Sequence, residues 1–247
     1  MKSNYVDYNF LKSIERIDEI LTTSDSSFEE LDYIPAREKL TFTNGFYVKC
    51  SALFVDIRKS SELTDKHRRP TPAKIYRVFI SEVVAVMNGD LNCAEINVVG
   101  DCVWGIFNTP YKEDIDSLFS KAAKISSLID IMNCKFKKRG IAEIKIGIGI
   151  SYGRALMVKA GYKGSCINEV VWMGDVVNKA SILAKIANKT AFDKEIMVTN
   201  LIYNNLSEKK QKLLEKDELR DCYRGDVINI KMNKWYKENC KEQSSTW

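Results

Sequence analysis

Short apolar runs bounded by polar residues recur along the chain and predict buried strands. One such run, residues 52–55, ends at Asp56 before a polar turn. A second pair of runs, residues 93–98 and 102–107, surrounds a Gly-Asp turn that carries Asp101. The first run is typical of an interior strand, and the second pair is typical of a β-hairpin.

Apolar residues at helical spacing predict amphipathic helices between these strands. The first helix covers residues 5–21, the second starts at Pro72, and the third covers residues 114–138. The remaining predicted elements are, in chain order, strands at 144–151, 155–160 and 169–172, a helix that starts at Asp175, a strand at 195–199, a helix at 201–215 and a strand pair at 219–223 and 227–230. This order predicts one α+β or α/β domain with a mixed sheet.

The predicted strand at 144–151 alternates isoleucine with glycine or lysine. Its glycines, Gly147 and Gly149, raise the hypothesis of a phosphate-binding loop. The strict alternation favours another interpretation, in which both glycines allow close packing of the backbone against a neighbouring element.

Composition narrows the class of protein. With 247 residues, of which 45% are hydrophobic, the chain can build one domain with a sizeable core. The net charge of +5 is mild and unclustered, so it does not indicate a nucleic-acid groove. The seven cysteines lack metal-ligand spacing, which favours free buried thiols in a reducing compartment. No apolar run approaches the roughly 20 residues of a membrane span, so we expect a cytoplasmic protein.

Asp56 and Asp101 are the candidate metal ligands. They lie 45 residues apart, each next to a predicted strand. If those strands are neighbours, both carboxylates reach one edge of the sheet, where hard oxygen ligands suit divalent cations. Either aspartate alone is better explained as a strand-end cap or a turn residue.

Four motifs in a fixed order identify a family resemblance. They are FVDI at 54–57, GD at 100–101, GDVVNKAS at 174–181 and YRGDVINIK at 223–231. The chain resembles the class III nucleotidyl cyclases over roughly residues 47–236, and within them the pyrimidine cyclases of bacterial anti-phage signalling. The resemblance implies a ferredoxin-like α+β domain at 47–236 with a mixed, mainly antiparallel sheet flanked by helices. Residues 1–46 then form an N-terminal helix and linker, and residues 237–247 a polar tail.

The resemblance also implies a site. Asp56 and Asp101 match two aspartates that bind two Mg²⁺ or Mn²⁺ ions, and the backbone carbonyl of Ile57 matches a further metal contact. Asn178 matches an asparagine that positions the ribose and phosphates, and Lys231 matches a lysine that binds the triphosphate. In such proteins each site forms between two subunits of a homodimer, with the aspartates from one subunit and the Asn and Lys from the other.

Two positions differ from the purine-specific pattern. Asn97 and Val171 stand where purine cyclases carry a lysine and an acid or threonine that read the base, and Trp172 follows Val171. An amide at 97 suits a pyrimidine carbonyl, and valine at 171 cannot bond an exocyclic amine. We therefore expect a pyrimidine substrate. The resemblance, rather than any residue, favours UTP over CTP.

A third difference concerns the reacting phosphate. The transition-state arginine of the family corresponds to Ile182, which cannot stabilise phosphoryl charge. Lys185 lies on the same helix face as Asn178, two turns on, and is the candidate replacement.

The leading hypothesis is a homodimeric cyclase that makes a 3′,5′-cyclic pyrimidine monophosphate and pyrophosphate as a messenger in anti-phage defence, read by an effector encoded elsewhere. The alternatives are an adenylate cyclase with an altered base pocket and a non-catalytic domain that senses nucleotide. An RNA-binding ferredoxin-like module is more distant, because no aromatic RNA-binding strand is visible.

Overall fold

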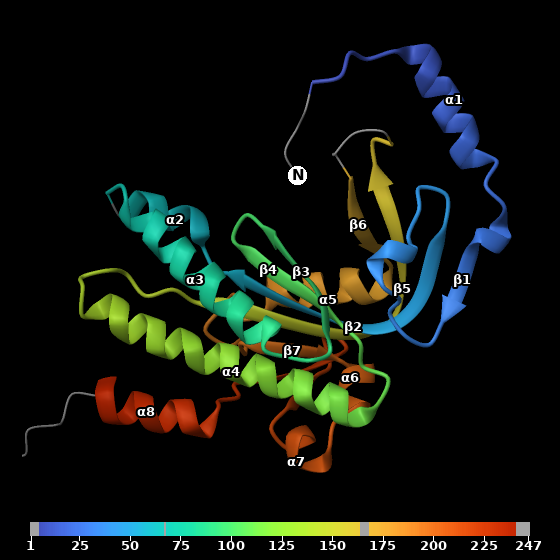
Figure 1. Cartoon of the computed structure of the whole chain (residues 1–247). Coiled ribbons are helices and arrows are strands. Elements are labelled where there is room, and N and C mark those ends of the chain that lie inside the picture. The colour runs from blue at the N-terminus through green and yellow to red at the C-terminus, as the bar shows by residue number, and fades with distance from the viewer. Residues whose placement is uncertain (1–4, 67, 164–167, 241–247) are drawn as a thin grey trace, which may run out of the picture.

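A mixed sheet forms the centre of the chain in this computed structural model, which describes residues 5–66, 68–163 and 168–240 (Figure 1). Within these ranges the sheet has nine strands, in the order β3-β4-β2-β5-β7-β9-β8, with β1 beside β2 and β6 beside β5. The pairs β1–β2 and β5–β7 are parallel and the others are antiparallel. The prediction of a mixed, mainly antiparallel sheet in an α+β domain is confirmed.

The strands are β1 (Phe28–Leu31), β2 (Gly45–Ile57), β3 (Cys93–Val99), β4 (Cys102–Phe107), β5 (Ile146–Gly161), β6 (Asn168–Met173), β7 (Ile196–Thr199), β8 (Glu215–Asp217) and β9 (Cys222–Gly225). The α-helices are α1 (Phe10–Leu21), α2 (Ser60–Lys66), α3 (Thr71–Asn88), α4 (Lys112–Lys137), α5 (Asp175–Ile186), α6 (Asn200–Asn205), α7 (Glu208–Gln211) and α8 (Ile230–Cys240).

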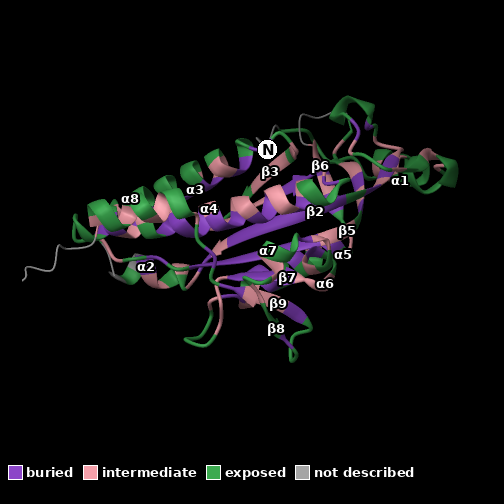
Figure 2. Ribbon diagram, turned by 90° about the horizontal axis from the view of Figure 1, so that it is seen from below, coloured by how far each residue is buried: buried purple, intermediate pink, exposed green. Residues whose placement is uncertain are grey.

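Strand β2 separates two hydrophobic layers because its side chains alternate between faces. Leu53 and Val55 pack with α3 and α4, whereas Ala52 and Phe54 pack with α5. Asp56 continues the second set, so it lies on the α5 face of the sheet. Figure 2 shows that buried residues concentrate on the central strands and on the inner sides of the helices.

The close approach of α5 to β5 depends on two glycines. A Cβ atom on Gly149 would come closer than 3.0 Å to the backbone of Ala180 and Ala184 in α5, and one on Gly147 would do the same at Ala184 and Ala187. The interpretation of Gly147 and Gly149 as sites of close backbone packing is therefore confirmed. These residues lie inside a strand and do not form a phosphate-binding loop.

Several predicted boundaries are wrong. The strands expected at 144–151 and 155–160 are one long strand, β5, because its backbone pairs with all thirteen residues of β2. The helix expected at 201–215 is divided at Ser207 into α6 and α7, and its end belongs to β8. The last strand pair is β8–β9, so it ends before residue 227.

The C-terminal segment corrects a further prediction. Residues 227–230 were expected to form a strand, but helix α8 begins at Ile230. The side chain of Asn229 accepts a hydrogen bond from the Met232 backbone N–H at 3.1 Å, which is the action of a helix N-cap. Helix α8 lies alongside α4 (Figure 1), so the polar tail predicted from residue 237 is helical as far as Cys240. Residues 241–247 lie outside the described part of the chain.

The cysteines also depart from expectation. Cys134 in α4 and Cys240 in α8 form a disulfide, with a Cα–Cα distance of 5.8 Å. Cys50, Cys93, Cys102 and Cys222 are free thiols, and Cys166 lies outside the described residues. The prediction of free thiols throughout is therefore wrong for the pair that joins α8 to α4.

Helix α1 confirms the predicted N-terminal helix, although it begins at Phe10 rather than residue 5. It has no buried residue, and it is joined to the β5–β6 region by an ion pair between Lys163 and Glu19. Within the described part of the chain, no helix combines the length and apolar character needed to cross a bilayer.

We predict that Gly149→Ala lowers the free energy of unfolding by roughly 2–3 kcal/mol, because the added methyl group must push α5 off the sheet. Urea unfolding followed by circular dichroism measures the change. Gly153→Ala is the matched control on the same strand and face, because its Cβ would meet only the Val176 side chain at 3.6 Å. Equal stabilities of the two variants would contradict the role given to Gly149.

Candidate active site

Asp56 and Asp101 meet at one edge of the sheet. Strand β2 pairs with β4 so that Asp56 lies opposite Cys102, and Asp101 directly precedes Cys102 in the β3–β4 turn. Gly100 forms this turn with φ +62°, a backbone conformation that favours glycine. The register thus brings together the two carboxylates that the sequence proposed as metal ligands.

The acid pair is electrostatically costly by itself. Burial raises the pKa of the Asp56 carboxyl above its ordinary value, and the neighbouring charge of Asp101 raises it further. The charges of Arg58 and Lys185 act in the opposite direction. A cation between the carboxylates would remove the repulsion, so this edge is chemically suited to divalent metal.

The two side-chain donors are carboxylates, which suit hard cations such as Mg²⁺. Among the described residues, no cluster of three or more His, Cys, Asp or Glu side chains has metal-binding geometry. Two carboxylates then leave the remaining positions to backbone oxygens, water and the phosphates of a substrate, which is how Mg²⁺ is usually held. Ile57, whose carbonyl is the third proposed ligand, is the last residue of β2 and follows Asp56 directly.

Arg58 is a further charged residue beside the acid pair, and it was not among the residues that the sequence singled out. Its Nη2 donates to the Oδ2 atom of Asp56, and its Nη1 donates to the carbonyl oxygen of Lys185 at 2.6 Å. The Arg58 side chain is only 10% exposed. Positions 56 and 58 point to the same face of an extended chain, and that spacing was the available signal.

Helix α5 carries two further candidate site residues, Asn178 and Lys185. Asn178 lies exposed in the first turn of α5, and Lys185 lies exposed in its last turn. They are seven positions apart, which corresponds to about 10 Å along the helix. Lys185 therefore lies at the Asp56 end of α5, and Asn178 lies at the other end.

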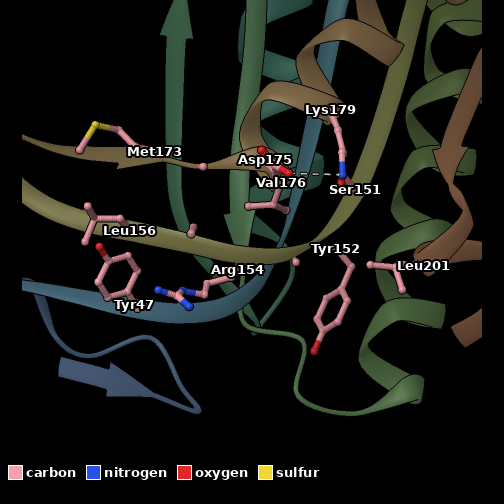
Figure 3. A pocket seen from close by; sticks show the side chains of 13 residues that line it. Tyr47, Ser151, Tyr152, Arg154, Leu156, Met173, Asp175, Val176, Lys179 and Leu201 are labelled. Carbon is pink, nitrogen blue, oxygen red and sulfur yellow. Dashed lines mark ion pairs between the residues drawn. The ribbon is translucent and has the colours of Figure 1, made fainter. Parts of the chain in front are cut away.

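A pocket of about 520 Å³ opens beside the start of α5 (Figure 3). Strand β5 contributes Arg154, whose guanidinium carbon lies 4.2 Å from the centre of the Tyr47 ring. Helix α5 contributes Asp175 and Lys179, which form an ion pair at 3.5 Å. The pocket adjoins the helix turn that carries Asn178. Arg154, Lys179 and the positive N-terminal end of α5 therefore share this part of the surface with Asn178.

Lys231 lies apart from both the acid pair and Asn178. It lies exposed in the first turn of α8, and α8 packs outside α4. Helix α4 covers the opposite face of the sheet from α5. The structure thus separates Lys231 from Asn178, although the family resemblance implies that both contribute to the same half of a site.

The three residues assigned to the base divide between the two faces of the sheet. Asn97 pairs with Trp104, whose ring stacks on Phe54 at 5.0 Å, so Asn97 lies on the α5 face. Trp172 also packs into the α5-side cluster. Val171 alternates to the other face and lies opposite Val158.

Asn97 and Trp172 share a second property. Within the described residues, the Asn97 Nδ2 and the Trp172 Nε1 are buried donors without a hydrogen-bond partner. A buried donor without a partner is costly, so both groups are suited to an acceptor supplied by a ligand.

The sequence of residues 44–229 matches the profile of a protein family described as the adenylate and guanylate cyclase catalytic domain. The chain is 39% identical to a uridylate cyclase from Gulbenkiania mobilis, over 97% of this chain and 100% of the relative. It is 38% identical to a uridylate cyclase from Treponema porcinum, over 92% of this chain and 80% of the relative.

Solved structures of cyclases have a similar fold. The adenylyl cyclase CyaB from P. aeruginosa superposes with a TM-score of 0.58 and 18% identity, over 70% of this chain and 85% of that one. The guanylyl cyclase Cya2 superposes with a TM-score of 0.60 and 12% identity, over 75% of this chain and 95% of that one. The predicted cyclase-like fold is confirmed.

We predict that Asp56→Asn and Asp101→Asn change the metal-free stability in opposite directions. Asp56→Asn leaves the buried Arg58 guanidinium without its charged partner and should lower the free energy of unfolding by roughly 1–3 kcal/mol. Asp101→Asn removes repulsion and should raise it by up to about 1 kcal/mol. Urea unfolding in EDTA measures both changes. Equal destabilisation by the two substitutions would contradict the described arrangement of charges.

Proposed function

The chain belongs to the adenylate and guanylate cyclase catalytic domain family, the class III nucleotidyl cyclases, and we propose that it converts UTP into 3′,5′-cyclic UMP and pyrophosphate. The observation that carries the chemistry is the pair of adjacent carboxylates, Asp56 and Asp101, at one edge of the sheet. The uridylate cyclase relatives and the unpartnered Asn97 Nδ2 donor support the choice of base.

The reaction is an in-line displacement at the α-phosphorus. The ribose O3′ forms a new bond to phosphorus, the bond to the bridging oxygen breaks, pyrophosphate leaves, and the O3′ proton passes to solvent. Two Mn²⁺ or Mg²⁺ ions, when bound, neutralise phosphate charge and favour ionisation of the 3′-hydroxyl. Asp56, Asp101 and the Ile57 carbonyl would hold these ions.

The other polar groups have positioning roles in this proposal. Asn178 orients the ribose and phosphates through its amide. Lys185 supplies positive charge near the acid pair. It takes over the role of the family's arginine, whose position is occupied here by the uncharged Ile182. The placement of Lys231 does not support its proposed contact with the triphosphate beside Asn178.

We also propose that each site forms between two subunits. Asn178 and the acid pair lie toward opposite ends of α5, so a second chain, arranged head to tail, would bring the Asn178 of one subunit to the aspartates of the other. The resemblance to pyrimidine cyclases further supports a messenger role in anti-phage defence, with the effector encoded elsewhere.

One observation favours a second candidate function. The exposed Ile182 stands where a catalytic arginine is expected, which suits a domain that binds nucleotide without turnover. Turnover measurements separate this nucleotide sensor from the proposed enzyme. An adenylate cyclase with an altered base pocket would differ from both by its product.

We predict that incubation with each of the four nucleoside triphosphates and Mn²⁺ yields cyclic UMP as the main product, identified by mass spectrometry. Asp101→Asn should lower turnover at least 100-fold, because metal binding loses one of its two carboxylates, while the fold persists by circular dichroism. Binding without any product would support the sensor, and cyclic AMP as the main product would support the adenylate cyclase.

The shared site predicts complementation between inactive variants. Asp56→Ala and Asn178→Ala chains should each be inactive alone and regain activity when mixed, because a heterodimer keeps one site with all its groups. Subunit exchange is verified by native mass spectrometry, and each variant mixed with itself is the control. No recovery after verified exchange would place the whole site within one chain.

The orphan amide of Asn97 predicts how the base is chosen. Its Nδ2 donor suits the O4 acceptor of uracil, whereas cytosine presents an amine at that position. Asn97→Asp replaces the donor with an acceptor and should shift the UTP/CTP ratio of kcat/KM toward CTP by about 10–100-fold. Val171→Thr, of similar shape on the other face of the sheet, is the control and should leave the ratio unchanged. A shift in the control alone would assign base choice to Val171.

A further inference from the structure

Arg58 joins two parts of the molecule that the proposed reaction uses. Its Nη2 donates to the carboxylate of Asp56 and, at 3.3 Å, to the Asp56 carbonyl oxygen. Its Nη1 donates to the carbonyl oxygen of Lys185 at 2.6 Å. One buried guanidinium therefore links the end of β2 to the last turn of α5.

The contact with Lys185 satisfies part of a helix terminus. The last carbonyl groups of a helix lack intrahelical partners, and a cation there also interacts favourably with the helix dipole. Helix α5 ends at Ile186, so the Lys185 carbonyl is one of these groups. Arg58 thus helps to hold the C-terminal turn of α5 in place.

The contact with Asp56 places Arg58 where a metal ion would bind. A divalent cation needs the lone pairs of the same carboxylate and repels a guanidinium beside it. Lys185 differs in kind, because its exposed side chain acts on Asp56 as a nearby charge. The two basic residues near the acid pair therefore allow direct competition to be separated from a general charge effect.

We propose that Arg58 is a positioning residue that competes with the divalent cation for Asp56 and thereby couples cation binding to the C-terminal turn of α5. Without cation, Arg58 bridges Asp56 and α5. When the cation binds, the guanidinium leaves the carboxylate and its support of the helix end weakens. This inference rests on the proposed metal-dependent function, because it assumes that Asp56 is a metal ligand.

The first test measures Mn²⁺ affinity without nucleotide, by isothermal titration calorimetry and by the electron paramagnetic resonance signal of free Mn²⁺. Arg58→Met should bind Mn²⁺ at least ten-fold more tightly than the unchanged chain, because the competitor is gone. Lys185→Met, which removes one nearby positive charge without removing a hydrogen bond to Asp56, should tighten binding by no more than about three-fold. Equal gains would overturn direct competition in favour of a charge effect.

The second test follows amide hydrogen exchange in α5. In the unchanged chain, Mn²⁺ should increase exchange at residues 183–187 several-fold, whereas in Arg58→Met exchange should be fast with or without Mn²⁺. If Arg58→Met does not fold, Arg58→Lys serves, because one ammonium group keeps the charge but cannot span both contacts. Exchange at 183–187 that is unchanged or slowed by Mn²⁺ in the unchanged chain would overturn the coupling.

The two hypotheses fail in different ways. If Asp101→Asn leaves Mn²⁺ binding unchanged and the enzyme makes no cyclic nucleotide, the metal assignment falls and the proposed function falls with it. If Mn²⁺ binds, Asp101→Asn weakens it and UTP is cyclised, but Arg58→Met leaves affinity unchanged, only the role of Arg58 is overturned.

Discussion

The close contact between α5 and β5 is the constraint on which the candidate site depends. Gly147 and Gly149 leave no room for a Cβ atom, so the helix backbone rests directly on the strand. This close packing positions Asn178 and Lys185, both on α5, relative to Asp56 on the sheet. Strand β5 also pairs with all thirteen residues of β2, the strand that carries Asp56. The acid pair and α5 are therefore both positioned by β5.

The acid pair shows how the fold tolerates an unfavourable group where function requires it. Burial and mutual repulsion oppose ionisation of Asp56, while Arg58 and Lys185 favour it. The thiol of Cys102, beside both acids, also has a raised pKa. Burial and the two carboxylates raise the pKa of its thiol to about 12, so it remains neutral. The positive charges of Arg58 and Lys185 therefore offset part of the cost of ionising Asp56.

Helix α8 is held in place by contacts that do not involve the candidate site. Helix α8 is fastened to α4 by the Cys134–Cys240 disulfide and by a hydrogen bond from Lys138 Nζ to the Asn239 carbonyl at 2.9 Å. These contacts lie on the face of the sheet opposite α5. Lys231 in α8 therefore lies on the other side of the sheet from Asn178, although both match family motifs in sequence.

Local sequence pattern was enough to predict the strand that carries Asp56, the hairpin that carries Asp101 and the close packing at Gly147 and Gly149. Those features follow from local periodicity and from the absence of a side chain, which any fold of this chain must respect. Only the tertiary structure shows the contact of Arg58 with the Lys185 carbonyl, the face on which Val171 lies and the pairing of Cys134 with Cys240. Each depends on which distant segment packs alongside, and local spacing carries no information about that. The end of the chain shows the limit most clearly, because residues 227–230 suit a strand by composition, yet the Asn229 cap and packing against α4 begin a helix there.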